Sequence, residues 1–287
     1  MKFELIAIVA IYVAFALAEA ISTGFFRKSG ATRQDAVVEV IGTTVLLVVT
    51  QPLALAGGIF LAHLVAPGAQ AALSGWPILA QIALLLLCDD MMQYWWHRLS
   101  HTVPSLYNLH RPHHNAEYMS VRIVYRNNIF YYLLMPSLWL SGVLVYLGLG
   151  WVYAGYVVVK MAAIIAAHSD RRWDAPLYRV PWLSPVMWLV ERTVSTPATH
   201  AAHHGKHADD GVTHYKGNFG NLLFFWDVLF GTAKITRRYP EKIGVENLPP
   251  TTAAAQLLWP LVPVPRAAPR TCHADAASLM TDPATTV

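Results

Sequence analysis

The chain has 287 residues, of which 55% are hydrophobic and only 13% charged, about half the charged fraction of an ordinary soluble protein. Its formal net charge of +4 is modest, and the basic residues lie mostly in short segments between apolar runs, a pattern that fits a membrane surface better than nucleic acid. The two cysteines, Cys88 and Cys272, indicate neither a disulfide framework nor a cysteine metal site. We therefore expect an integral membrane protein with one membrane domain over residues 1–262 and a disordered tail over 263–287.

Five apolar runs are expected to cross the membrane as helices, giving an all-α helical bundle. They cover residues 3–22, 37–65, 76–96, 129–148 and 151–167. The first run has an alternative interpretation as a signal peptide, because Lys2 precedes it and Ala16-Leu-Ala18 resembles a cleavage site; the spans that follow favour an uncleaved helix.

Two of these runs have special features. Pro52 and the pair Gly57-Gly58 interrupt the second run, where we expect a kink. The last two runs are joined by a turn too short to leave the membrane interface, so they should form a hairpin. Lys160 lies within the fifth run, where a charge is costly unless paired, and we expect a structural partner for it rather than a role in a site.

The distribution of basic residues orients the bundle. Segments 27–33, 98–126 and 171–172 carry arginines or lysines and fall on one side of the five crossings. The uncharged loop 66–75 and the hairpin turn fall on the other side. Because lysine and arginine accumulate in cytoplasmic loops, we expect an outside amino terminus and a histidine-rich cap on the cytoplasmic face.

Two later apolar stretches are not expected to cross. Residues 174–196 alternate prolines with Trp182, Trp188 and other apolar residues, which predicts an amphipathic segment lying on the bilayer interface. Residues 222–230 are too few to span and are expected to close the cap against the membrane.

Eight of the thirteen histidines fall into three boxes beside these apolar runs. The boxes are His97 and His101, then His110, His113 and His114, then His200, His203 and His204. Helical residues three or four apart lie on one face about 5–6 Å apart, so each box can direct its imidazoles toward one point. Neutral imidazole is the commonest metal ligand and suits iron, zinc, copper or nickel. Eight histidines exceed the needs of one metal, so the boxes predict a dinuclear site.

The boxes contain no carboxylates, unlike the soluble di-iron bundles, which use glutamates together with histidines. A metal centre at the ends of membrane helices would meet cytoplasmic reductants on one side and bilayer lipid on the other. Activation of dioxygen to attack an unactivated carbon–hydrogen bond requires both.

The motifs resemble those of a known superfamily. They are D-x-x-x-Y-W-x-H-R-x-x-H from Asp90 to His101, HRPHH from His110, TPATHAAHH from Thr196, NFG from Asn218, and WDVLFGT from Trp226. Together they resemble the fatty acid hydroxylase and sterol desaturase superfamily over residues 86–232. The resemblance implies a membrane-embedded, histidine-bound di-iron centre that hydroxylates, oxidises or desaturates lipids with dioxygen and supplied electrons. It also implies that His168, at the end of the last hairpin helix, is a ninth ligand.

Within the superfamily, the segment from His113 to Glu117, followed by Arg126, resembles the alkylglycerol monooxygenase branch. The chain departs from that branch at Thr199, where the branch has another histidine, and at Lys216, where it has an aspartate. For this reason an ether-lipid substrate and a pterin cofactor are not carried over.

Two aspartates are expected to support catalysis, because a ligating histidine usually donates its second ring nitrogen to a carboxylate or carbonyl. Asp90 lies seven residues, or two helical turns, before His97, and Asp227 is the next candidate. Either could instead satisfy buried polar groups or cap a helix. His207 and His214 are expected to be solvated loop residues.

His63 and His273 are expected to be uninvolved in the site. Three functions compete. The favoured one is a lipid hydroxylase or desaturase that receives electrons from a separate reductase or carrier, since no cytochrome-like or flavin-binding segment is visible. A membrane zinc hydrolase would need neither oxygen nor reductant. A metal transporter would place its ligands near the membrane midplane, whereas these boxes lie at or beyond the helix ends.

Overall fold

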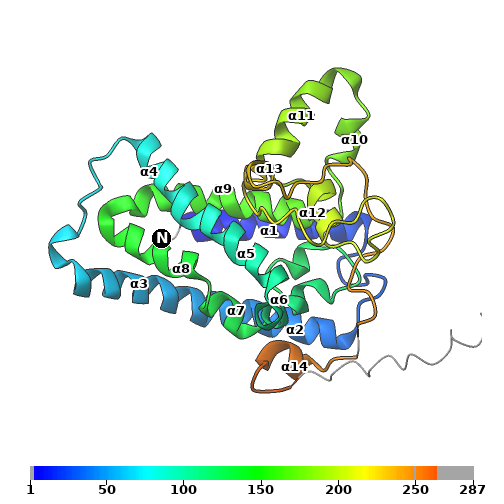
Figure 1. Ribbon diagram of the computed structural model, residues 1–287, viewed down its shortest axis with the longest axis horizontal. Helices are drawn as coiled ribbons and strands as arrows, with labels where there is room; N and C mark the ends of the chain where they lie inside the picture. Colours follow the sequence, from blue (N-terminus) through cyan, green and yellow to red (C-terminus); the bar gives the residue numbers. More distant parts are fainter. Residues whose placement is uncertain (1–2, 249, 264–287) are drawn as a thin grey trace, which may run out of the picture.

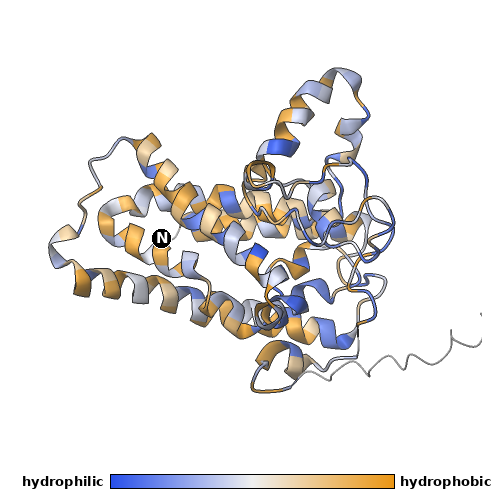
Figure 2. Ribbon diagram, viewed as in Figure 1, coloured by the Kyte–Doolittle hydropathy of each residue, from blue (hydrophilic) through white to orange (hydrophobic). Residues whose placement is uncertain are grey.

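The computed structural model describes residues 3–248 and 250–263, which are helical apart from connecting loops and two isolated β-bridges (Figure 1). The long helices run roughly along the longest axis of the molecule, and the loops of the C-terminal half gather at one end. Hydrophobic residues follow the long helices, while hydrophilic ones concentrate at the end where these loops gather, which we call the cap (Figure 2). The tail predicted after residue 263, with His273, lies outside the described residues.

Four helices are long and apolar enough to cross a membrane, so the chain is a multi-pass membrane protein. They are Phe3–Ser22, Arg33–Val65, Ile78–Thr102 and Ile129–His168. The last contains the predicted hairpin: α8 (Pro136–Leu144) and α9 (Gly150–His168) are separated by a reversal at Gly148, whose φ of 107° is in the region that favours glycine (Figure 1). The predicted count of five crossings stays a prediction.

The hairpin turn and the uncharged loop lie together, as predicted from their shared lack of charge. The Ala71 amide donates to the Tyr146 carbonyl at 3.0 Å, and the Leu73 amide donates to the Leu147 carbonyl at 2.8 Å. The histidine boxes lie at the other end of the bundle, so the two ends of the molecule differ sharply in charge. The cytoplasmic placement of the histidine end stays a prediction.

The second span changes helix type shortly before Pro52, which lacks a backbone donor. It consists of α2 (Arg33–Val45), a π-helical segment η1 (Leu46–Thr50) and α3 (Gln51–Val65), and the wide turn of η1 ends two residues before Pro52. The predicted interruption at Gly57-Gly58 is wrong, because α3 continues through both residues. A Cβ at Gly58 would lie 2.1 Å from the Trp139 carbonyl oxygen, so this glycine lets α3 and α8 pack closely.

The first helix, α1 (Phe3–Ser22), packs along α9 and is part of the fold. Its Glu19 side chain is fully buried and accepts hydrogen bonds from Ser120 Oγ at 2.6 Å and from the amides of Val121 and Asp170, both at 3.1 Å. These partners lie just beyond the second histidine box and just beyond His168. The expectation that this run is an uncleaved membrane helix stays a prediction.

The third span supplies the first box. It runs through α4 (Ile78–Leu85), a π-helical segment η3 (Leu86–Met91) and α5 (Met92–Thr102), and α6 (Pro104–His114) follows. Asp89 in η3 forms a buried ion pair with Lys160 and accepts a hydrogen bond from Tyr156 Oη at 2.7 Å. The predicted structural partner of Lys160 is therefore confirmed.

The cap contains α12 (Pro197–His203), α13 (Phe225–Leu229) and α14 (Ala253–Leu258). An arm formed by α10 (Ala175–Tyr178), η6 (Pro181–Leu183) and α11 (Ser184–Thr193) projects from the body (Figure 1). Trp182 and Trp188 on this arm are 76% and 54% exposed. Their placement at a bilayer interface stays a prediction.

Candidate metal centre

Four helices bring the histidines to one end of the bundle. Box one lies on α5, box two on α6, His168 ends α9, and box three lies on α12 and the residue after it. The start of α12 is strongly specified, because Thr196 forms a capping box with Thr199 and Pro197 occupies the first turn. Asp174 adds a further acceptor for this turn, 2.9 Å from the Ala198 amide.

The nine predicted ligands form two groups of imidazoles, each with its candidate ligand atoms within 4.8 Å of one another. The first group contains His97, His101, His110, His114 and His203, and the second contains His113, His168, His200 and His204. Both HxxHH boxes are divided between the groups. Consecutive residues on a helix point about 100° apart, so His113 and His114 reach opposite groups.

Five of the nine rings are oriented by a hydrogen bond at Nδ1. The acceptors are the carbonyls of Phe219 for His97, Ile123 for His113, Ile164 for His168 and Gly217 for His203, and the amide oxygen of Asn127 for His110, at 2.7 to 3.0 Å. Because each acceptor is an oxygen, each Nδ1 carries the proton. This fixes the tautomer and leaves the Nε2 lone pair directed inward.

The Nε2 atoms converge too closely for neutral rings alone. His97 Nε2 lies 2.9 Å from His110 Nε2 and 3.0 Å from His203 Nε2. All three rings are protonated at Nδ1, so these contacts join lone pairs and are not hydrogen bonds. Burial holds the pKa of His110 and His203 well below the usual value, so protonation does not relieve the contact. A bound cation would relieve it, because each Nε2 lone pair could then be directed at the cation.

Other atoms of the centre support the same fit. His101 Nε2 is buried without a hydrogen-bond partner among the described residues, as a nitrogen awaiting a metal would be. The burial of His113, His114, His200 and His204 lowers the pKa of each well below the usual value, so these rings are also neutral. The residues fit two imidazole-bound metal ions, with five and four candidate donors and no carboxylate in either group.

The aspartates act through the backbone. Asp227 accepts hydrogen bonds from the amides of Phe219 at 2.8 Å and Gly220 at 2.6 Å, and the carbonyl of Phe219 orients His97. Burial raises the pKa of Asp227 to about 6, against the hydrogen bonds that favour its ionised form. Asp90 accepts from Trp226 Nε1 at 2.8 Å and from the Leu223 amide at 3.1 Å.

The prediction that a ligating histidine donates a hydrogen bond to Asp90 or Asp227 is therefore wrong. Neither Asp90 nor Asp227 accepts one from a histidine in the part of the chain that the structure describes. Backbone carbonyls and Asn127 take that place because loops 115–128 and 214–220 pass directly behind the rings. The aspartates hold one of these loops and the helix that follows it.

Several positioning residues were not identified from the sequence. Arg126 is fully buried, donates to the Pro112 carbonyl at 2.7 Å inside box two, and pairs with Asp35 at 2.6 Å. Asn127 orients His110, and Glu19 ties α1 to two segments near the centre. A carboxylate inside an apolar run, as at Glu19, is a signal that could have been used.

The remaining histidines lie apart from the centre. His207 is partly exposed and lies 3.4 Å from Glu246, and His214 donates its backbone amide to the Ala202 carbonyl at 2.6 Å. Neither joins either group of imidazoles. His63 packs against the ring of Tyr146 at the far end of the bundle.

The fold and the centre together define a class: a multi-pass helical membrane protein with a buried polyhistidine centre suited to two metals. The comparisons with known proteins identify the family. The fatty acid hydroxylase family matches residues 82–232, more than half of the chain, and the chain belongs to this family. Membership implies an oxidoreductase.

Similarity to an individual protein is more distant. Alkylglycerol monooxygenase from Danio rerio is 27% identical over 149 residues, which cover 52% of this chain and 29% of that protein. The chain therefore spans less than a third of the length of this relative. No solved structure matches the chain.

Proposed function

We propose that this protein is a membrane-bound, non-haem di-iron oxygenase that uses dioxygen and supplied electrons to hydroxylate a lipid. The observation that carries the proposal is the pair of adjacent, buried imidazole groups without a carboxylate at the ends of membrane helices. Two irons held by the nine histidines would supply the redox chemistry that activates dioxygen. The protein's own contribution is to fix the donors and to exclude water.

The fixed donors follow from the Nδ1 hydrogen bonds. With its proton held by a carbonyl, a ring such as His203 offers only Nε2 and loses little freedom when it binds a metal. The rings of His110 and Tyr131 stack at 4.9 Å, and Trp96 lies behind Tyr131 at 5.7 Å, which shields the first group with apolar surface. A dry pocket suits an oxidant strong enough to attack a carbon–hydrogen bond.

A lipid substrate is supported by an apolar cavity of about 400 Å³ close to box two. It is lined by Leu106, Leu109, Phe130, Leu134 and four neighbouring residues, none of them charged. Leu109 packs in one apolar cluster with Trp96 and Tyr131, and Tyr131 stacks on His110, so an alkyl chain in this cavity would lie behind the residues that cover the first group of imidazoles. We favour hydroxylation over desaturation because of the similarity to a monooxygenase.

The electrons would come from a separate reductase or carrier. The basic residues near the histidine end support a cytoplasmic position for the centre, where such a donor would have access. Asp90 and Asp227 would act by holding the loop behind His97 and the helix α13.

The test is to express the protein with an electron source and to follow oxygen-18 from labelled dioxygen into membrane lipids, while measuring the metal content of the purified protein. Iron in the protein and label in a lipid are the expected results. With competent reductant and bound iron, lipids that are neither labelled nor desaturated would contradict the proposal. Oxygen-independent turnover with zinc would identify a hydrolase.

A further inference from the structure

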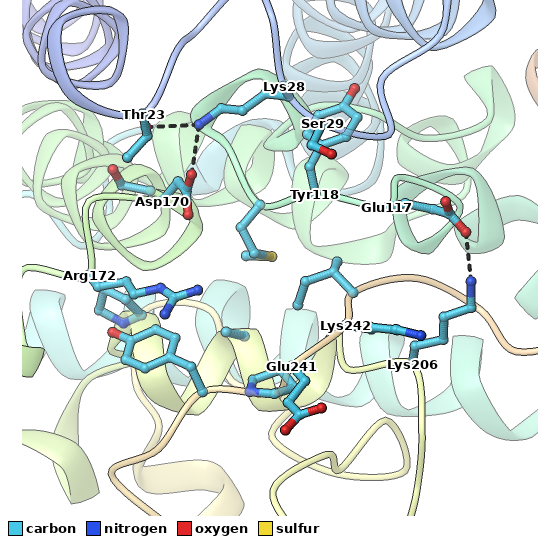
Figure 3. A pocket seen from close by; sticks show the side chains of 17 residues that line it. Thr23, Lys28, Ser29, Glu117, Tyr118, Asp170, Arg172, Lys206, Glu241 and Lys242 are labelled. Carbon is cyan, nitrogen blue, oxygen red and sulfur yellow. Dashed lines mark hydrogen bonds and ion pairs between the residues drawn. The ribbon is translucent and has the colours of Figure 1, made fainter. Parts of the chain in front are cut away.

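A second cavity of about 400 Å³ opens in the cap, on the outer side of the segments that carry the histidines (Figure 3). Met119 follows box two, Arg172 follows His168, and Ala201 lies within box three, so this cavity backs onto the centre. Its lining is polar and charged, unlike that of the apolar cavity beside box two. Nothing in the proposed oxygenase mechanism uses it.

Four of the charged groups that line this cavity form two ion pairs. Lys28 Nζ lies 2.9 Å from Asp170, and Lys206 Nζ lies 2.7 Å from Glu117. These ion pairs join segments that are far apart in sequence and hold the walls together (Figure 3). They leave the other charged residues of the lining to interact with a ligand.

Arg172 has no ion pair or side-chain hydrogen bond among the described residues. Its guanidinium lies 4.5 Å over the ring of Tyr239 and points into the cavity (Figure 3). The backbone of Arg172 has a φ of 43°, in the left-handed region that a residue with a side chain rarely adopts. The stack holds the planar fork of the guanidinium in place before any ligand arrives.

The rest of the lining has cations on both sides and an apolar floor. Lys242 and Lys206 lie across the cavity from Arg172 (Figure 3). The lining contains four cations, Lys28, Arg172, Lys206 and Lys242, and three acids, Glu117, Asp170 and Glu241, a formal charge of +1. Met119 and Ala201 belong to a buried apolar cluster against which Ile243 packs, and all three face the cavity.

We propose that this cavity binds the phosphate monoester group of an organic molecule, with Arg172 as the principal anion-binding residue. A stacked, preorganised guanidinium matches the oxygens of a phosphate by paired hydrogen bonds. The volume exceeds that of a phosphate group alone, which leaves room for an organic portion against the apolar floor. The inference concerns a site separate from the metal centre and does not depend on the proposed reaction.

The chemistry has two possible sources, a lipid headgroup and a water-soluble phosphate ester. The experiment is isothermal titration calorimetry of the full-length, metal-loaded protein in detergent, with dihexanoyl phosphatidic acid and with phenyl phosphate. Dihexanoylglycerol, which lacks the phosphate, is the control ligand. Binding of both phosphates identifies the phosphate group as the recognised feature, whereas binding of phosphatidic acid alone identifies a lipid headgroup.

Arg172→Ala should weaken binding roughly tenfold or more, because it removes a charge-assisted pair of hydrogen bonds. Arg171→Ala, which changes the exposed neighbour outside the lining, should stay within about twofold. If Arg172→Ala is unstable, Lys242→Ala at an exposed position serves instead and should weaken binding severalfold. No binding of either phosphate, equal binding of dihexanoylglycerol, or equal losses in Arg171→Ala and Arg172→Ala would overturn the proposal.

Discussion

The inner side of the cap, which holds the histidines, and the outer side, which holds the charged cavity, differ in whether their polar side chains are neutral or ionised. Box two directs His113 and His114 inward, and three residues later Glu117 reaches the outer cavity. His168 lies inside, whereas Arg172 lies outside. The inner side contains only uncharged imidazoles, and the outer side contains ionised side chains.

Hydration explains the difference. Burial makes a charged imidazole costly, so the inner rings stay neutral, and their lone pairs are free to bind a metal ion. The outer pair Lys206 and Glu117 is partly exposed and keeps its charges with the help of water. Changes on the inner side should therefore have large effects, and matched changes on the outer side small ones.

The largest contrast is expected between two histidines four residues apart, one at the end of α12 and one in the loop that follows. His203→Ala should reduce lipid oxidation at least 100-fold and lower the iron content, because it removes one donor and leaves its neighbours around a gap. His207→Ala, at a residue outside both groups, should retain activity. Label incorporation and metal analysis of membrane-inserted protein provide the measurements; activity retained in His203→Ala would remove box three from the site.

Removal of metal should be the next largest effect. His97 Nε2 lies within 3.0 Å of the Nε2 atoms of His110 and His203, and a bound cation would stabilise this arrangement. Metal bound to the folded state at about 1,000 times its Kd contributes roughly 4 kcal/mol, which chelation should remove. Thermal unfolding in detergent, with and without chelator and with ferrous iron restored, measures the change; an unchanged Tm would contradict the assigned centre.

A smaller but still substantial loss is expected from Arg126→Met. The substitution leaves Asp35 with an uncompensated charge and removes the donor to the Pro112 carbonyl, at a cost of about 3 kcal/mol. Arg238→Met serves as the exposed control and should change the free energy of unfolding by less than about 0.5 kcal/mol. SDS-induced unfolding of both variants makes the comparison, and similar losses would show that burial does not set the difference.

The smallest expected effect is on metal affinity in Asp227→Asn. The amide keeps the shape of the side chain but loses the charge that holds the amides of Phe219 and Gly220, so the loop that orients His97 loosens. Loss of such indirect support lowers metal affinity roughly tenfold. Asp209→Asn, on an exposed loop, should bind metal as before. Competition with a fluorescent chelator measures both, and equal affinities in the two variants would count against the positioning role.

Sequence alone determined which segments enter the membrane and which histidines gather. Hydrophobic runs and the spacings HxxxH and HxxHH are local properties of the sequence. Once a segment is helical, its apolar length makes it a membrane span and its histidine spacing places the rings on one face, whatever the rest of the chain does. All nine predicted histidines lie in the two groups, although His168 was identified only through the family resemblance. The hairpin at Gly148 was likewise encoded by a short turn between two apolar runs.

Tertiary structure decided how those histidines are divided and held. The separation of His113 from His114 depends on where α9 and α12 arrive, and four of the five acceptors of the Nδ1 protons are backbone carbonyls with no side-chain signature. The sequence predicts a kink at Gly57-Gly58, and only the fold shows that Gly58 lets the carbonyl of Trp139 lie against α3. In each case the partner is distant in sequence, so its identity follows from packing and not from any local pattern.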